Sequence, residues 1–162
     1  MAEFIYPSPE WLAESTNRYG ADFEKKLKKL SGYYVYRIKA EPSWGLDKDL
    51  MMCSVLENGK LLRLEHCSEE DAKRDADFIL AAEVKTWKQI LRKLDKFVGA
   101  FLGKRIKLEK GNAEKALGLA PYANILVDSL TQVDLKFPDE LDAPALENFK
   151  TSLAYFRAAK GL

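Results

Sequence analysis

Apolar runs and alternating positions in the middle of the chain predict a sheet. Residues 33–39 are rich in aromatic and β-branched side chains, which favour strands. Two further apolar runs flank Asn58-Gly59. This dipeptide is the strongest short-range signal for a β-hairpin, because both residues of the tight turn must adopt φ > 0. The predicted strands are residues 33–39, 50–57, 60–67, 77–82 and 105–109.

Apolar residues at helical spacing lie on both sides of these strands. Ser8-Pro9 is a typical helix start, with a capping hydroxyl followed by proline in the first turn. Three helical stripes follow the fourth strand: residues 84–94, a short helix over 97–102 that ends at Gly103, and residues 120–133. Beyond Pro138 and Pro144, a last stripe comprises Leu146, Phe149, Leu153 and Phe156. Strands and helices in this order predict an α+β protein with its helices gathered on one side of the sheet.

Length and charge restrict the class of protein. The chain has 162 residues, which suits one domain with an extra arm. We expect a domain over residues 1–133, and a linker and C-terminal helix packed on it over 134–162. With 26 basic and 25 acidic residues, the formal net charge is +1, so we expect no nucleic-acid partner. No apolar run approaches the roughly 18 residues of a membrane span, and the N-terminus lacks signal-peptide features, so we expect a cytoplasmic protein.

Few residues suggest catalytic or metal chemistry. His66 is the only histidine, and no serine or cysteine is placed in the sequence to act with it, so we expect no catalytic residues. One histidine and two cysteines cannot supply a four-ligand zinc site, and we expect no metal and no cofactor. A two-residue turn at Asn58-Gly59 would place Cys53 opposite Leu64. Cys53 and Cys67 would then lie on opposite faces of the hairpin, which predicts no disulfide.

An ordered set of short motifs resembles the sterol carrier protein-2 family. The set comprises Ala76-Asp77-Phe78-Ile79-Leu80-Ala81, then Trp87 in a helix, Leu94-Asp95, Ala100-Phe101-Leu102-Gly103-Lys104-Arg105-Ile106-Lys107-Leu108, Gly111-Asn112 and Ala116-Leu117. The resemblance covers roughly residues 8–133 and is dense from 76 to 118. It departs from the family pattern at Lys96-Phe97 and at Asn112, where the family usually has an Asp.

The resemblance implies a five-stranded mixed sheet covered by helices, with an apolar tunnel for a fatty acid, acyl-coenzyme A or sterol-like lipid. It implies non-catalytic lipid binding or transfer. The segment 134–162 runs beyond the usual end of the family's domain, and its helix could cover the tunnel mouth, pack on another face or make a dimer. The same apolar stripes could instead be plain core in a protein-interaction or regulatory module without a lipid ligand. The expected lining residues are Trp87, Ile90, Leu91, Leu94, Phe97, Val98, Phe101, Leu102, Tyr122, Ile125, Leu126 and Leu130.

The stretch from Lys85 to Lys115 is strongly basic. It contains ten lysines and arginines but only Asp95, Glu109 and Glu114 as acids. Such a stretch could attract an anionic membrane surface transiently. It could equally be a solvated face that the acidic C-terminal segment balances. The sequence leaves both interpretations open, and it leaves the oligomeric state unknown.

Overall fold

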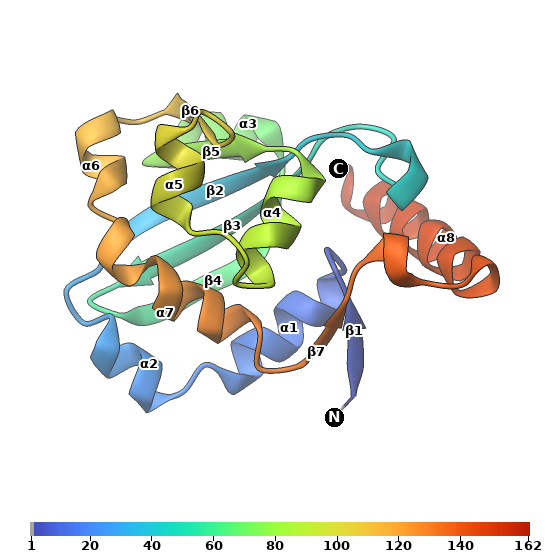
Figure 1. The fold of residues 1–162 in the computed structure, drawn as a ribbon, viewed down its shortest axis with the longest axis horizontal. Helices are drawn as coiled ribbons and strands as arrows, with labels where there is room; N and C mark the ends of the chain where they lie inside the picture. Colours follow the sequence, from blue (N-terminus) through green and yellow to red (C-terminus); the bar gives the residue numbers. More distant parts are fainter. Residues whose placement is uncertain (1) are drawn as a thin grey trace.

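The structure is a computed structural model that describes residues 2–162. A five-stranded mixed sheet forms its centre, with strand order β4-β3-β2-β5-β6 (Figure 1). β2 pairs antiparallel with β3 and parallel with β5. The predicted α+β class and the five-stranded mixed sheet are confirmed. The strands are β2 (Gly32–Ile38), β3 (Leu50–Glu57), β4 (Lys60–Cys67), β5 (Phe78–Ala82) and β6 (Lys107–Lys110).

The hairpin of β3 and β4 turns at Asn58-Gly59, as predicted. Both residues have positive φ, 49° and 83°, and a side chain at Gly59 would collide with the backbone of residues 24–28. The register then shifts between Val55 and Leu56, which leaves Leu62 without a partner. A one-residue shift moves every later side chain to the other face.

This β-bulge corrects the prediction for the two cysteines. Cys53 lies opposite Glu65 instead of Leu64, and Cys67 lies opposite Met51. Both thiols are therefore buried on the same face of the sheet, in the smaller core. They form no disulfide. The expectation of opposite faces was wrong because alternation alone does not reveal an extra residue in one strand.

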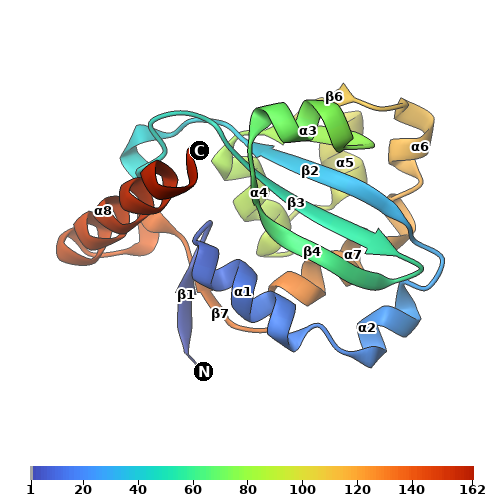
Figure 2. The ribbon, with the colours of Figure 1, turned by 180° about the vertical axis from the view of Figure 1, so that it is seen from behind.

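Helices cover both faces of the sheet unequally. α4 (Val84–Leu91), α5 (Phe97–Leu102) and α7 (Ala120–Leu130) lie over one face (Figure 1), and α3 (Glu69–Asp75) lies over the other (Figure 2). The larger hydrophobic core fills the space beneath the three helices, and a smaller one lies beneath α3. α1 (Pro9–Arg18) begins at the predicted cap Ser8 and packs along β4. The short helices α2 (Ala21–Lys26) and α6 (Ala113–Leu117) complete this part.

A strand near the N-terminus pairs with a strand that precedes the C-terminal helix, in a ribbon that the sequence did not indicate. β1 (Glu3–Ile5) pairs in parallel with β7 (Asp134–Lys136). A 3₁₀ turn η2 (Pro138–Glu140) leads into α8 (Ala143–Lys160), which begins at its cap Asp142. Backbone hydrogen bonds thus join the start of the segment 134–162 to residues 3–6.

α8 buries its apolar stripe at one end of the molecule. Phe149 and Leu153 are buried, and the ring of Phe156 contacts that of His66 with centroids 5.3 Å apart. The Arg157 guanidinium donates to the carbonyl oxygens of Lys48 and Asp49, at 2.9 and 2.6 Å. α8 therefore docks on β4 and on the loop before β3, which includes the 3₁₀ turn η1 (Pro42–Trp44). Within residues 2–162, no helix has both the length and the apolar character to cross a membrane.

Candidate functional site

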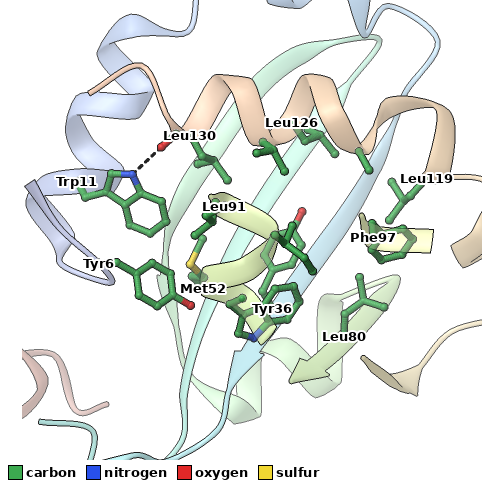
Figure 3. A pocket seen from close by; sticks show the side chains of 14 residues that line it. Tyr6, Trp11, Tyr36, Met52, Leu80, Leu91, Phe97, Leu119, Leu126 and Leu130 are labelled. Atoms are coloured by element: carbon green, nitrogen blue, oxygen red, sulfur yellow. Dashed lines mark hydrogen bonds between the residues drawn. The ribbon is translucent and has the colours of Figure 1, made fainter. Parts of the chain in front are cut away.

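A cavity of about 80 Å³ lies between the sheet and α7. The sheet forms its floor, α4 and α5 form its walls, and α7 covers it, while the N-terminal segment closes one end (Figure 3). Tyr6 and Trp11 lie at that end, and Phe97 and Leu119 lie at the other. The lining residues are Tyr6, Trp11, Tyr36, Met52, Leu80, Trp87, Ile90, Leu91, Phe97, Leu119, Ala123, Leu126, Val127 and Leu130.

Protein partners already satisfy most polar groups in this wall. The indole N–H of Trp11 donates to the Leu130 carbonyl oxygen at 2.8 Å, and that of Trp87 donates to the Arg37 carbonyl oxygen at 3.1 Å. The Tyr36 hydroxyl pairs with the Ser54 hydroxyl at 2.9 Å, and burial raises the pKa of Tyr36 to about 12. Since these groups have little left to offer a ligand, the cavity suits an apolar one.

The structure brings half of the predicted lining residues together. These six are Trp87, Ile90, Leu91, Phe97, Leu126 and Leu130. Three others, Phe101, Tyr122 and Ile125, are half-buried and pack against the core without lining the cavity.

Leu94, Val98 and Leu102 point to solvent, with 74%, 36% and 64% of their surfaces exposed. Leu94 was predicted from helical spacing, but α4 ends at Leu91, so this spacing no longer determines which way the Leu94 side chain points. Val98 and Leu102 are one turn apart, and neither lies on the side of α5 from which Phe97 enters the cavity.

Eight lining residues were not predicted. Tyr36 is opposite Met52 on β3 and opposite Leu80 on β5, so these three form one row across the sheet. The strand register was the signal that could have revealed this row. Tyr6 and Trp11 carry no such signal, because only the folded chain places the N-terminal segment there. The unpredicted residues are Tyr6, Trp11, Tyr36, Met52, Leu80, Leu119, Ala123 and Val127.

A second depression of about 210 Å³, which we call the outer groove, adjoins the cavity. Ile90, Phe97, Ala123 and Val127 line both spaces. On its outer side, the groove is lined by Lys93, Asp95, Lys96, Asn124 and Asp128. The Lys93 ammonium meets the Asp128 carboxylate at 2.8 Å, joining the segment after α4 to α7. The outer groove is thus a partly polar depression beside an apolar cavity.

The basic stretch is partly neutralised in the fold. The Lys88 ammonium lies 3.0 Å from the Asp139 carboxylate, and the Arg92 guanidinium lies 2.6 Å from that of Glu140. Arg105 pairs with Asp95 and holds the pKa of that carboxyl below its usual range. The acidic C-terminal segment therefore balances part of the stretch, as one of the two interpretations of the sequence proposed.

Comparison with solved structures identifies the fold. No family model and no curated protein matches the chain. A conserved hypothetical protein from Thermus thermophilus, described as possibly a sterol carrier protein, superposes with a TM-score of 0.65 at 22% identity, over 80% of this chain and 90% of that one. The crystal structure of sterol carrier protein 2 gives a TM-score of 0.64 at 22% identity, over 78% and 97% of the two chains. The chain has the sterol carrier protein 2 fold.

The same fold occurs in the palmitated SCP2L2 protein from Aedes aegypti. That structure gives a TM-score of 0.52 at 20% identity, over 72% of this chain and 94% of the other. The sterol carrier protein 2 fold was expected from the motifs in residues 76–118, and this expectation is confirmed. At these identities the likeness establishes the fold, whereas the ligand has to be argued from the cavity itself.

Proposed function

We propose that the protein binds an apolar lipid in the cavity beneath α7 and transfers it without changing it chemically. The observation that carries this proposal is the composition of the cavity wall. Its fourteen side chains include no carboxylate, imidazole, amine or thiol. Such a wall favours burial of hydrocarbon. Its two phenols, Tyr6 and Tyr36, have pKa values raised by burial, so both stay protonated and neither is a ready general base. Palmitate on one protein of the same fold supports a fatty-acyl or similar ligand.

Hydrocarbon burial supplies enough free energy for this function. Each buried methylene contributes about 0.8 kcal/mol, so a long chain binds without any charged contact. An apolar cavity of about 150 Å³ accepts benzene. The 80 Å³ cavity is smaller than that, so a whole lipid requires the cavity to widen.

α7 is the wall best suited to move outward. Its cavity-facing side chains Ala123, Leu126, Val127 and Leu130 are only half-buried. The exposed Lys93–Asp128 ion pair that ties α7 to the segment after α4 contributes at most about 1 kcal/mol. We propose that this side, next to the outer groove, opens to admit the lipid.

The small volume also favours a second candidate, an interaction module whose core is nearly filled by its own side chains. Native mass spectrometry of freshly purified protein, followed by displacement of a fluorescent fatty acid, separates the two. We expect co-purified lipid or saturable binding with a micromolar or lower dissociation constant. Protein that carries no lipid and shows no saturable binding would refute the lipid proposal and favour the interaction module.

We further propose that the outward face of α5 touches anionic membranes. Leu94, Val98 and Leu102 are exposed beside this helix. Among residues 2–162, Lys96 and Lys104 near these side chains have no acidic partner within ion-pair distance, unlike Lys93 and Arg105. Exposed apolar side chains with lysines around them are the features of an interfacial membrane contact.

Free thiols at Cys53 and Cys67 support the further proposal of a cytoplasmic location.

Lipid transfer to vesicles tests the membrane contact. Transfer to vesicles containing phosphatidylserine should exceed transfer to phosphatidylcholine vesicles. It should slow with salt, because the Debye length falls from about 10 Å at 0.1 M to about 3 Å at 1 M. Leu102→Asp should reduce the rate, whereas Leu62→Asp, at the exposed bulge of β4, should not. Equal rates with both vesicle types, or equal effects of the two variants, would contradict this contact.

A further inference from the structure

Tyr6 is held rigidly at one end of the cavity. Its backbone N–H donates to the Lys136 carbonyl oxygen at 2.9 Å, which fixes it to the β1–β7 ribbon. Its ring lies 5.1 Å from that of Phe137 and 5.2 Å from that of Trp11, centroid to centroid, and only 2% of the residue is exposed. Aromatic rings thus pack against this phenol on several sides and orient it.

The hydroxyl of this phenol has no hydrogen-bond partner among residues 2–162, in contrast to that of Tyr36, which pairs with Ser54. Figure 3 shows the Tyr6 hydroxyl turned toward the other lining side chains. Burial raises the pKa of Tyr6 well above its ordinary value, so the group stays protonated and can donate. No fully covered side-chain oxygen or nitrogen among residues 2–162 lacks a partner, so this unpaired hydroxyl borders the open space of the cavity, where a ligand oxygen can accept from it.

We propose that Tyr6 is the polar anchor of the cavity and donates a hydrogen bond to a neutral oxygen of the lipid. The ligand class is then an apolar body that ends in a hydroxyl or carbonyl group, such as a long-chain alcohol, a ketone or a sterol. This inference rests on the proposed lipid-binding function. It adds an orientation in which the neutral oxygen enters first and lies deepest, beside Tyr6.

A carboxylate does not suit this end of the cavity. The lining side chains include no cation, and a buried carboxylate with a single donor is strongly unfavourable. Lys93 and Lys96 lie in the outer groove, which adjoins the cavity at Phe97 and not at Tyr6. A fatty acid therefore binds with its carboxylate toward the outer groove, and only a neutral oxygenated lipid uses the anchor.

Three probes of equal chain length test the anchor: 1-dodecanol, n-dodecane and dodecanoate. Each displaces a fluorescent lipid from the wild-type protein, from Tyr6→Phe and from Tyr36→Phe. Tyr6→Phe should weaken dodecanol about three- to tenfold, the effect of one ordinary hydrogen bond. It should change the affinities of dodecane and dodecanoate less than about twofold. Tyr36→Phe is the matched control, because the Tyr36 hydroxyl lines the same cavity but already has a protein partner, Ser54. In this variant, the ratio of the dodecanol affinity to the dodecane affinity should stay as in the wild type.

The possible outcomes separate the anchor from the proposed function. If the wild type binds none of the three probes, lipid binding itself is refuted. If it binds them but Tyr6→Phe leaves dodecanol unchanged, or weakens all three equally, the anchor is wrong and the lipid proposal stands. Should Tyr6→Phe fail to fold, NMR of the wild type with isotope-labelled tyrosine replaces it. Dodecanol should then shift one phenol resonance that dodecane leaves in place, and the absence of such a shift would overturn the anchor.

Discussion

Replacing Ala123 by leucine should make the protein more stable and a poorer lipid binder. Ala123 lines the cavity from α7, and the space in front of it measures about 80 Å³. Leucine adds three carbon atoms there. At about 0.8 kcal/mol for each buried methylene, filling this space contributes up to about 2 kcal/mol. Alanine and leucine have similar helix propensities, so α7 itself is little affected.

Thermal and urea unfolding measure the first effect. A gain of about 2 kcal/mol raises the melting temperature of a chain of this size by roughly 4–8 °C. Displacement of a fluorescent fatty acid measures the second effect. A ligand that loses contact for about three methylenes should bind more than tenfold more weakly. Ala154→Leu on the exposed side of α8 is the control and should change neither quantity.

Two results would refute this reasoning in different ways. If Ala123→Leu lowers the free energy of unfolding by about 1–3 kcal/mol, as overpacking does, the core is already filled and the interaction module is favoured. If stability rises while lipid affinity stays the same, the cavity exists but does not hold the ligand.

Three further changes test the core, the histidine and the C-terminal segment. Ile79→Asp should unfold the protein, because it buries an unpaired carboxylate under α3. Circular dichroism should show this loss of structure, and it should show that the control variant Leu102→Asp, at an exposed position, stays folded. A folded Ile79→Asp variant would contradict this packing. Burial lowers the pKa of His66 to about 4, so the unfolded chain binds a proton that the folded protein does not between that pH and about 6.5. Urea unfolding should therefore show that the free energy of unfolding falls by about 3 kcal/mol as the pH is lowered from 6.5 to 4, and that it is fully retained above pH 6.5. If His66→Gln loses stability equally steeply over this range, other groups cause the effect. Phe137→Ala should cost about 3–5 kcal/mol in thermal unfolding, because this residue is fully buried, and an unchanged melting temperature would show that the segment after residue 133 is dispensable for folding.

The local chemistry of the sequence determined the elements of the sheet. Asn58-Gly59 specifies the hairpin because both residues tolerate positive φ, and the structure has that turn. The doubly apolar stretch at residues 78–82 became an internal strand between β2 and β6. Helical spacing brought Trp87, Ile90 and Leu91 to one side of α4, where they line the cavity. These features depend on neighbours a few positions apart, which a sequence displays directly.

The tertiary structure decided what each face of an element meets. The bulge at Leu62 put both cysteines on one face, since an extra residue reverses the alternation without changing composition. The sequence predicted a short helix over residues 97–102, but only its packing decided that Phe97 faces the cavity and that Leu102 faces solvent. Tyr6 reached the cavity only because β1 pairs with β7, about 130 residues away in the sequence. Contacts between such distant segments depend on the packing of the whole chain, and no local periodicity records them.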